Sequence, residues 1–438
     1  MRVACLKPKK PNFAGSTLFV AFNAPPGRWI RILSRKGVMA VTATDTWPAP
    51  DTASQRPAGF RPELRDGARS VKSTPAKSIT VLCVTPCGRF GRGGIDRLYY
   101  HLRSSPEVKL PDHIQIHNFV GRGSARAAGW VLTFPWRIVR FACCLMWLRP
   151  DIVHLNFSND GSIYRKYFFL LVANLFKIPS VIHFHGQFTA ADIARARLPM
   201  RFLRSMCARA TRVIALGKCY WSSFAADFGV STEKLDILAN GIADFAVNVP
   251  LPKQGDERVR LLFIGEIGHR KGIDILVDAL AQLAPRTRAW SCLIAGNGDS
   301  ALFQQRVSQA SCADLVDFVA WLEPKEVERA LLHADIVILP SRADTMPMSL
   351  IEGACAGAAL VATRVGEIEE IVQDGRNGVL VPPSGAALSA ALERLISQRK
   401  ELARMQFESR KVYNEKFKIE TFVEGLSAVY GRALTTQA

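Results

Sequence analysis

Two acidic side chains, Asp344 and Glu352, lie eight residues apart in the stretch SRADTMPMSLIEG, on either side of a Met-Pro-Met turn. The preceding run DIVILPS is apolar enough for a buried strand, and the residues after the turn have helical spacing. Pro347 then falls in the first turn of a helix and Glu352 in the second. Both carboxylates can reach a ligand lying across this helix N-terminus; alternatively, Asp344 or Thr345 simply caps the helix.

A second loop places two cations beside a helix start. In GEIGHRKGID, Arg270, Lys271 and Gly272 stand between a predicted strand and the next predicted helix. Free backbone N–H groups and the positive end of the helix dipole favour anions at such a position, and two cations add to that preference. The pattern predicts a diphosphate site, although both side chains could also be ordinary solvated loop cations.

Glycine-rich turns follow two other predicted strands. Gly93 and Gly94 lie in GRGGID, and Gly296 and Asn297 lie in AGNGDS. Glycine lets a backbone approach a phosphate or a sugar closely, because it has no Cβ. Neither turn is a complete dinucleotide-binding fingerprint, so a plain tight turn is equally consistent with each of them.

Two histidines, His183 and His185, stand two residues apart in SVIHFHG, and a strand would place them on one face. His185 is expected at the carboxyl end of that strand, beside Gly186, where it can contact a substrate. The alternative is a packed polar histidine with no ligand.

These side chains come from distant parts of the chain, so the fold has to bring them together. From residue 78 onward, strand-like runs alternate with helix-length segments. We predict an α/β domain over residues 78–245, a linker over 246–257 and a second α/β domain over 258–410. Residues 411–438 form a C-terminal helix that either stays on the second domain or crosses back to the first. Both domains are expected to be Rossmann-like, doubly wound parallel sheets that face each other, with ligands in the cleft between them.

The strand predictions rest on short apolar runs that end in glycine, proline or polar residues. The first domain contains SITVLCVTP, IQIHNFV, DIVHLNFS, SVIHFHG and RVIALG, and the second contains VRLLFIGEI, SCLIAGNG, VDFVAWL, DIVILPS, ALVATRV and NGVLVPP. Helices are expected between these runs, including an arginine-bearing helix over about 128–148 and a basic one near 196–210.

The net charge of +19 is unevenly distributed over the 438 residues. Residues 1–77 hold 14 basic and 4 acidic side chains, residues 78–245 hold 21 and 10, and residues 246–438 hold 22 and 24. We expect residues 1–77 to be a disordered basic extension, because they are rich in Pro, Ser and Arg and lack sustained periodicity. A basic first domain favours anionic lipid or phosphorylated substrates, and a merely solvated basic face is the alternative.

Several classes of protein are disfavoured. The ten cysteines show no CxxC pair and no Cys/His metal spacing, so we expect reduced thiols in a cytosol and no bound metal. The most apolar run, AAGWVLTFPWRIVRFACCLMWL, contains Arg137, Arg140 and Pro135, which argues against a membrane-spanning helix but permits one at a membrane surface. Nucleic-acid binding lacks interleaved aromatic side chains or a known motif.

Taken together, these pieces resemble family 4 of the glycosyltransferases, which have the GT-B fold. The most specific piece is LPSRADTMPMSLIEGACAGAALVATRVGEIEEIVQDGRNGVLVPP, which is similar to the family pattern of two acids flanking seven residues. GGID, DIVHLNFSNDGSIYRK, VIHFHG, LANGI and FIGEIGHRKGID support the resemblance. It runs from about residue 80 to 430. It implies transfer of a sugar from a nucleotide diphosphate sugar with retention of anomeric configuration, without a metal or other cofactor.

The resemblance also implies roles for individual residues. Lys271, with Arg270, would neutralise the departing diphosphate, Asp344 would bind the donor sugar, and His185 would lie near the reacting centre; we therefore name His185, Asp344 and Lys271 as catalytic. Glu352 would hold the ribose. The remaining donor-binding residues would be Gly93, Gly94, Gly296, Asn297, Met346, Pro347 and Met348. We assign acceptor binding to Arg165, Lys166 and His183.

Four positions depart from the family pattern, one of them Thr345, which stands where a glycine often follows the first acid. Glu266 stands where the family usually has an arginine, and Arg270 on the same loop would compensate. Asp344 replaces a glutamate, and Glu367 follows Gly366 where a second glycine is common.

The expected function is hexosyl transfer to a glycan or polyprenyl-diphosphate-linked acceptor in surface polysaccharide, such as exopolysaccharide, or glycolipid synthesis. The expected location is cytoplasmic, with peripheral contact at the inner face of the cytoplasmic membrane. A catalytically silent GT-B scaffold in a glycosylation complex is the alternative, motivated by Glu266 and Asp344.

Overall fold

The computed structural model describes residues 78–86, 93–104, 111, 113–121, 129–159, 161–195, 198–248, 250–251, 258–298, 300–310 and 312–436. The predicted disordered extension over residues 1–77 lies outside the described residues. Both predicted α/β domains belong to one compact unit, residues 73–438.

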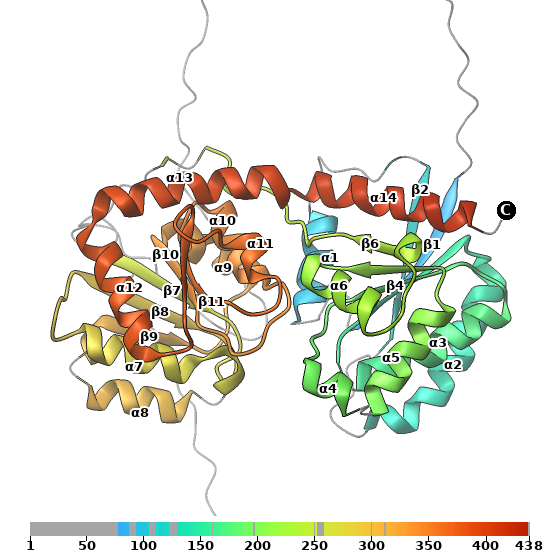
Figure 1. Ribbon diagram of the computed structural model, residues 1–438, viewed down its shortest axis with the longest axis horizontal. Helices are drawn as coiled ribbons and strands as arrows, with labels where there is room; N and C mark the ends of the chain where they lie inside the picture. The colour runs from blue at the N-terminus through green and yellow to red at the C-terminus, as the bar shows by residue number, and fades with distance from the viewer. Residues whose placement is uncertain are drawn as a thin grey trace, which may run out of the picture. The chain divides into compact units, whose positions relative to one another are not determined.

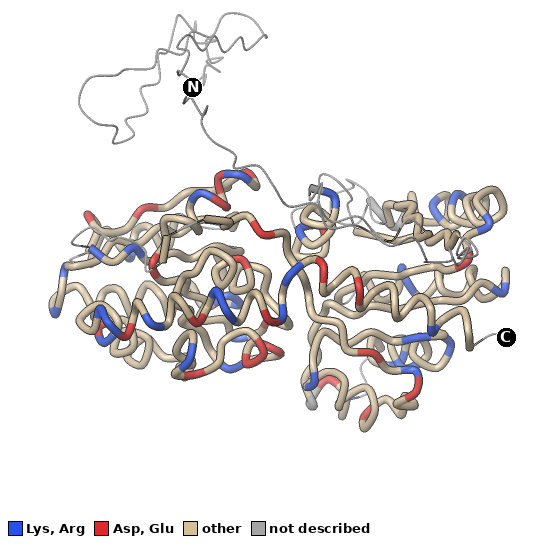
Figure 2. Tube along the Cα trace, turned by 90° about the horizontal axis from the view of Figure 1, so that it is seen from above, with Lys and Arg blue, Asp and Glu red and all other residues tan. Residues whose placement is uncertain are grey.

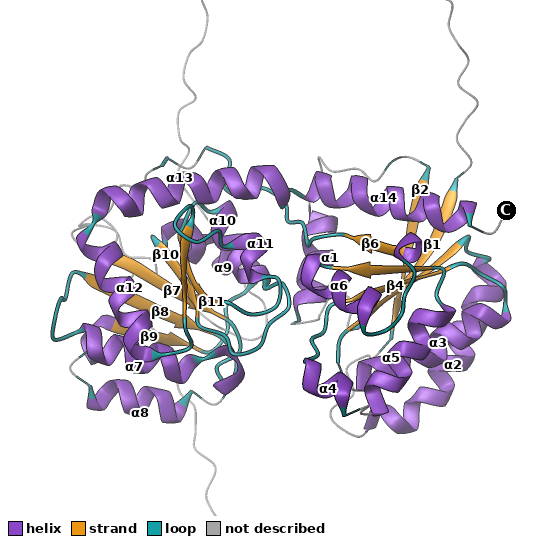
Figure 3. Cartoon of the chain, viewed as in Figure 1, coloured by secondary structure: helices purple, strands orange, loops and turns teal. Residues whose placement is uncertain are grey.

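The first domain is built on a six-stranded parallel sheet in the order β2-β1-β3-β4-β5-β6 (Figure 1, Figure 3). Its first five strands confirm the five predicted runs. The sixth is a three-residue strand that the sequence analysis missed, because LDI is too short to show a period. The strands are β1 Ile79–Thr85, β2 Ile114–Val120, β3 Ile152–Phe157, β4 Ser180–Phe184, β5 Arg212–Ala215 and β6 Leu235–Ile237.

Helices and one short 3-10 turn connect these strands. The two helices predicted near 128–148 and 196–210 are present as α2 and α5. None of the described helices combines the length and the apolar character that a membrane crossing needs. The bounds are α1 Gly94–Ser104, α2 Gly129–Leu148, α3 Gly161–Leu175, α4 Ala190–Ala194, α5 Leu198–Arg209, α6 Lys218–Ala226 and η2 Thr232–Lys234.

The second domain repeats the architecture with the strand order β12-β11-β10-β7-β8-β9, also parallel throughout. All six of its strands were predicted. They are β7 Val259–Ile264, β8 Trp290–Ala295, β9 Val316–Val319, β10 Ile336–Leu339, β11 Ala359–Thr363 and β12 Gly378–Val381. The connecting helices are η3 His269–Lys271, α7 Ile273–Leu283, α8 Ala301–Gln309, η4 Ala313–Leu315, α9 Pro324–His333, α10 Met348–Cys355, α11 Ile368–Ile371 and α12 Gly385–Ser397.

Four of the inner strands are buried at every position, which explains why they appear in the sequence as continuous apolar runs. β3, β4, β10 and β11 expose none of their residues. Helices cover both faces of a parallel sheet, so side chains pointing in either direction meet a packed layer. The polar side chains on these strands, including His154 and His183, are therefore buried as well.

Two consecutive helices complete the chain, and each packs on a different domain (Figure 1). α13, Arg399–Lys416, lies against α10 and β11, whereas α14, Ile419–Thr435, lies against β3 and β4 of the first sheet. The junction is fixed by Ile242, whose N–H donates to the carbonyl of Phe417 and whose carbonyl accepts from the N–H of Ile419, both at 2.9 Å. The last helix therefore crosses back to the first domain, and the break lies at 417–418, not at the predicted 410–411 boundary.

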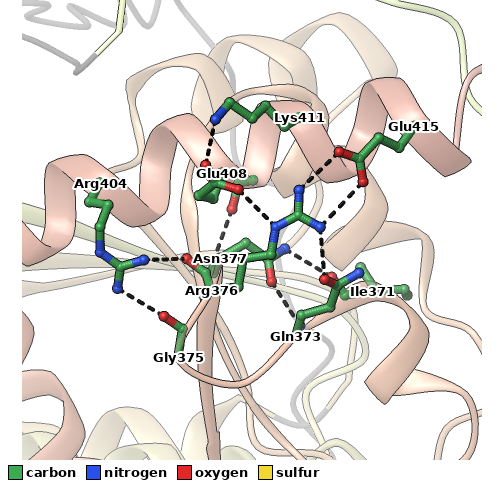
Figure 4. A network of polar contacts seen from close by, with 10 residues as sticks. Ile371, Gln373, Gly375, Arg376, Asn377, Arg404, Glu408, Lys411 and Glu415 are labelled. Atoms are coloured by element: carbon green, nitrogen blue, oxygen red, sulfur yellow. Dashed lines mark hydrogen bonds and ion pairs between the residues drawn. The ribbon is translucent and has the colours of Figure 1, made fainter.

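A polar network holds α13 on the second domain (Figure 4). The Arg376 guanidinium, which follows the turn at Gly375, donates to Glu408 at 2.8 Å and to Glu415 at 2.9 Å on α13. Arg404 on α13 donates in the other direction, to the carbonyl of Gly375 at 2.8 Å. The loop at residues 375–376 is thus hydrogen-bonded to three successive turns of α13, from Arg404 to Glu415.

A buried hydrogen bond anchors α14 on the first sheet. The Tyr430 hydroxyl and His154 Nδ1 are 2.8 Å apart, and both side chains are fully buried. Arg432 adds an ion pair with Asp236 at 2.7 Å. Within the described residues, the other ring nitrogen of His154 has no hydrogen-bond partner. The Tyr430 hydroxyl is therefore an important partner for this buried imidazole.

Tyr430→Phe is expected to lower the free energy of unfolding by about 1–3 kcal/mol, because it leaves a buried ring nitrogen unpaired. Thermal or urea unfolding measures the effect. Thr435→Ala is the control on the same helix, since the exposed Thr435 hydroxyl bonds only to carbonyls of its own helix among the described residues. Equal stability of the Tyr430→Phe variant and the control would contradict this account of the anchor.

Candidate functional site

The N-termini of α1 and α10 approach each other from the two domains. A Cβ built on Gly94 would lie 3.8 Å from the Met348 side chain. The first amides of any helix have no acceptor within that helix, so two sets of N–H donors face the same region. The predicted donor-binding residues Gly93, Gly94 and Met348 are thus brought together from different domains.

Asp344 and Lys271, which the sequence analysis assigned to different parts of a ligand, contact each other directly. Lys271 Nζ donates to Asp344 Oδ2, and the two side chains are 14% and 12% exposed. Lys271 comes from η3, which ends at Gly272 with φ of 71°, and a Cβ on Gly272 would lie 1.8 Å from the carbonyl oxygen of Pro340. The loop can therefore approach the end of β10 only because residue 272 is glycine.

Arg270 pairs with the residue that departs from the family pattern. Its Nη2 donates to Glu266 Oε2 at 2.6 Å, and its Nη1 donates to the carbonyl of Ala343 at 3.2 Å. Both side chains of the ion pair are about half exposed, and exposed pairs of this kind contribute only about 0–1 kcal/mol. An incoming anion can therefore compete with Glu266 for Arg270.

Neither Asp344 nor Thr345 caps α10, so this alternative is wrong. The cap residue is Pro347, with no side-chain cap. Asp344 Oδ1 accepts from the N–H of Thr345 at 3.1 Å, and the Thr345 hydroxyl donates to the carbonyl of Gly186 at 2.6 Å. Since neither oxygen closes the helix end, the N-terminus of α10 keeps its preference for an anion.

Asn240 of the first domain binds the Met-Pro-Met turn. Its side-chain amide donates to the carbonyl of Met346 at 3.2 Å, and its own N–H lies 3.3 Å from Met346 Sδ. Met346, Pro347 and Met348 are all buried. The turn predicted to line a donor is therefore held by a residue of the LANGI stretch.

The two glycine-rich strand ends of the second domain pack against each other. A Cβ on Gly296 would lie 1.6 Å from the carbonyl oxygen of Gly265, and the Asn297 carbonyl accepts from the N–H of Ile267 at 2.8 Å. This backbone approach explains the glycine at 296 without a ligand. Donor contact by Gly296 and the exposed Asn297 stays a prediction.

Glu352 is buried and binds two side chains of α1. Its Oε1 accepts from Arg97 Nε at 2.5 Å and lies 3.0 Å from His101 Nε2. Burial by itself would raise the pKa of Glu352, but the charge of Arg97 and the contacts of His101 outweigh it and hold the pKa below its usual range. The carboxylate predicted to bind ribose is thus an anion that bridges the two domains.

Glu367 makes a second carboxylate contact between the domains. Its oxygens accept the backbone N–H groups of Tyr220 at 2.8 Å and Cys219 at 3.2 Å, at the N-terminus of α6. Burial raises the pKa of Glu367, and these two hydrogen bonds lower it by less. The side chain that replaces a common family glycine therefore occupies an anion-binding position of the first domain.

His185 lies beside the residue that Thr345 contacts. Its N–H donates to the carbonyl of Phe157 at 2.8 Å, and Nε2 lies 3.1 Å from Asn156 Oδ1. Burial, with a smaller contribution from His154, lowers the pKa of His185 to about 3. The imidazole is therefore neutral near pH 7 and can offer a ligand one hydrogen-bond donor and one acceptor.

The three predicted acceptor-binding side chains are buried. His183 is wholly enclosed, with its ring centroid 4.0 Å from that of His185, so this arrangement offers an acceptor no direct contact with it. Burial also lowers the pKa of His183. Lys166 Nζ lies 2.6 Å from the position of a Cβ on Gly121, at the carboxyl end of β2, and Arg165 is 8% exposed. Acceptor binding by Arg165 and Lys166 stays a prediction.

Sequence reasoning missed four residues of this site: Arg97, His101, Asn240 and, except as a possible cap, Thr345. Their partners are 106 to 255 residues away in the chain, so no local pattern points to them. Arg97 and His101 do stand four apart on one face of α1, which is the available signal. As a whole, the site combines a cation, buried acids and two helix N-termini, which suits a ligand with both phosphate and hydroxyl groups.

Comparison with known proteins is consistent with this geometry. Residues 81–244 match the family model "Glycosyltransferase Family 4", and residues 258–398 match "Glycosyl transferases group 1". Amylovoran biosynthesis glycosyltransferase AmsK from Erwinia amylovora is 25% identical over 256 residues, 56% of this chain and 61% of AmsK. Alpha-D-kanosaminyltransferase from Streptomyces kanamyceticus is 24% identical over 177 residues, 40% of this chain and 46% of that protein. The chain thus spans about half the length of these relatives.

Solved structures show the same two-domain fold. Anabaena Alr3699/HepE in complex with UDP and glucose has a TM-score of 0.63 at 16% identity, covering 81% of this chain and 99% of that one. The apo form of the lipopolysaccharide outer core galactosyltransferase WaaB has a TM-score of 0.57 at 17% identity, covering 82% of this chain and 100% of that one. The GT-B fold expected from the sequence is confirmed.

Arg97→Met is expected to destabilise the protein by about 3–5 kcal/mol, because it leaves the buried Glu352 carboxylate without its main cation. Arg97→Met combined with Glu352→Met should recover much of that loss, and urea unfolding of both variants measures it. Because the Glu352 pKa is lowered, its contribution is present above pH 4.5 and is lost as the pH falls through the lowered pKa. If the double variant is less stable than the single one, the pair is not the source of the effect.

The contribution of Glu367 to stability is expected to depend on pH in the opposite sense to that of Glu352, and Glu367→Gln tests this. The raised pKa means that Glu367 contributes most below its usual pKa and progressively less as the pH rises through the raised value. The stability of the variant relative to the wild type should therefore increase between pH 5 and pH 8, as measured by thermal unfolding. Glu369→Gln, at an exposed position of the helix that follows Glu367 and paired with Arg364, is the control. If the stability of the variant relative to the wild type instead falls as the pH rises, the fold favours the ionised form of the Glu367 carboxyl group.

Proposed function

Because the chain belongs to glycosyltransferase family 4, we propose that it is a retaining hexosyltransferase that uses a nucleotide diphosphate sugar. The acceptor is a glycan or a polyprenyl-diphosphate-linked sugar of surface polysaccharide or glycolipid synthesis. One relative named for amylovoran biosynthesis and neighbours solved with UDP support this class of reaction and of donor. Since the chain spans about half of those relatives, its own sugar, acceptor and stereochemistry belong to the proposal.

The observation that carries the proposal is the Lys271–Asp344 pair beside the N-terminus of α10. Lys271 and the N-terminus of α10 would bind the two phosphates, and Asp344 would accept hydrogen bonds from sugar hydroxyls. Arg270 joins Lys271 when a phosphate displaces Glu266. The backbone of Met346, Pro347 and Met348 lines the diphosphate and the sugar.

Glu352 and His185 hold the two ends of the donor. Arg97 and His101 both bind Glu352 Oε1, so we assign Oε2 to the ribose hydroxyls. The neutral imidazole of His185 exchanges a hydrogen bond with a sugar hydroxyl. Gly93 and Gly94 let the start of α1 approach the donor from the first domain.

The chemical step breaks the bond between the anomeric carbon and the diphosphate oxygen, which leaves with the bonding electrons. The acceptor hydroxyl oxygen forms the new bond to that carbon, and its proton passes to the departing phosphate. Negative charge grows on the phosphate, so Lys271 and the α10 amides stabilise the transition state more than the ground state. No metal and no protein nucleophile is needed in this scheme.

The acceptor enters from the first domain, at the carboxyl ends of β1 and β2. We assign the binding of a phosphorylated acceptor to Arg165 and Lys166, which are both buried; support comes from Lys166 Nζ, which lies beside Gly121 at the carboxyl end of β2. The balance of +11 over residues 78–245 favours a lipid-linked diphosphate at an anionic membrane face, where the cytoplasmic protein would be peripherally bound.

A catalytically silent scaffold is the second candidate, because the cation Lys271 is already paired with Asp344 and Glu266 replaces an expected arginine. A scaffold could bind a donor without turning it over. Donor affinity and turnover therefore have to be measured separately.

Lys271→Gln is expected to lower the rate of nucleotide release by roughly 100-fold, in line with loss of one transition-state donor. A panel of nucleotide sugars, read by released nucleotide diphosphate, identifies the donor for this assay. Lys411→Gln, which breaks the exposed pair of Lys411 with Glu408 on α13, is the matched control. Binding of a donor without release by the wild type would favour the scaffold, and absence of both across the panel would reject donor use altogether.

A further inference from the structure

α2 has two opposed apolar faces. One faces the sheet and includes Ile138, Phe141 and Leu145, of which the last two are fully buried. Successive residues of a helix are about 100° apart, so residues 136, 139, 143, 146 and 147 point to the opposite side. A surface helix usually places polar residues there. On α2 four of these five positions hold Trp, Val, Met and Trp.

This outward face is exposed to solvent along three turns. Trp147 is 89% exposed and Trp136 66%, while Val139 and Met146 are each at least half exposed. Full exposure of an indole ring is unfavourable in water, because most of its surface is apolar. Two such rings on one helix face indicate a surface that has a partner.

α3 lies beside α2 and adds exposed apolar side chains of its own. It packs beside α2, and the rings of Phe134 and Phe168 are 5.8 Å apart. Phe168 and Leu175, seven residues apart on α3, are both exposed. Eight of the twelve exposed large hydrophobic residues in the described chain lie between residues 136 and 198, so the exposure is concentrated here. We call the outward faces of α2 and α3, with Trp136, Val139, Met146, Trp147, Phe168 and Leu175, the α2–α3 surface.

α2 and α3 themselves carry no acidic side chain. Residues 114–150 contain no Asp or Glu, so no acidic segment marked red in Figure 2 falls on α2. Arg140 lies on the outward face itself, Arg149 follows the end of α2, and Lys177 follows the end of α3; all three are exposed. An apolar stripe bordered by cations matches an anionic surface with an apolar interior.

We propose that the α2–α3 surface docks on an anionic lipid bilayer, with the two tryptophans in the headgroup region and the arginines and Lys177 on the phosphates. Tryptophan favours this interface because its ring is apolar and its N–H is polar. A second copy of the chain is a poorer occupant, since like cations would then face each other. The proposal rests on the proposed membrane contact of the enzyme, but lipid binding is measured without any transfer reaction.

The test is sedimentation of the full-length protein with vesicles of phosphatidylethanolamine, with and without phosphatidylglycerol. The wild type should bind the vesicles that contain phosphatidylglycerol and lose binding as salt is raised. Trp147→Ser and Trp136→Ser should each weaken binding by about tenfold, because each removes one apolar side chain that the docked bilayer would cover. Arg140→Gln should weaken it by about fivefold, and only on anionic vesicles.

Phe407→Ser is the matched control, since Phe407 is an exposed aromatic residue on α13 in contact with the second domain. It should bind like the wild type. Both tryptophans lie outside the core, so single serine variants are expected to fold, and their thermal unfolding checks this. No binding to anionic vesicles, equal binding by the tryptophan variants, or a dimer in solution that Trp147→Ser dissociates would overturn the proposal. Nucleotide release by the same proteins distinguishes failure of this surface from failure of the proposed reaction.

Discussion

The buried carboxylate of Glu352 is the constraint on which the site depends. An ionised carboxylate can be buried only if charged or polar partners replace the water it loses. Arg97 and His101 supply that replacement from the other domain, 255 and 251 residues away in the chain. They can do so only when α1 lies against α10, and this arrangement also places Gly94 beside Met348. One ion pair therefore brings the two helix N-termini together.

Other polar contacts between the domains have the same character. Thr345, Met346 and Glu367 surround the start of α10, and each bonds to the backbone or an amide of the first domain. Apolar packing alone has little direction, whereas hydrogen bonds fix distance and angle. The loops around a ligand site are thus held in one geometry by polar groups that a ligand itself could bind. Within the second domain, Lys271 pairs with Asp344 and Arg270 with Glu266. Because the Arg270–Glu266 pair is half exposed, a ligand oxygen can replace Glu266 at small net cost.

The two C-terminal helices also connect the domains, because they are consecutive in the chain and each packs on a different domain. α13 is bonded to the second domain through Arg376 and α14 to the first through Tyr430, with Ile242 paired to the chain between them. Residues of both domains and both helices consequently belong to one apolar cluster.

The strands and the helices between them could be predicted from local patterns, whereas the ligand contacts of the site residues stay predictions. Continuous apolar runs report burial on both faces of a sheet, and glycines and cations at strand ends report turns near a ligand. The sequence analysis missed β6 because three residues are too few to show a period. It missed the break at 417–418 because helical spacing is present both before and after these two residues. His183 and His185 have the same signal in the sequence, yet only His185 lies next to a residue that contacts the second domain.

What the sequence by itself determined was the type and order of the elements and the inventory of chemical groups at their ends. The tertiary structure decided which of those groups are partners. In the folded chain Lys271 pairs with Asp344, and Glu352 pairs with Arg97 and His101. Glu367 accepts a hydrogen bond from the N-terminus of α6, and His183 is fully buried. The physical reason is that secondary structure follows from short-range periodicity, whereas the pairing and pKa of a buried charge depend on whichever groups the fold places within hydrogen-bond distance.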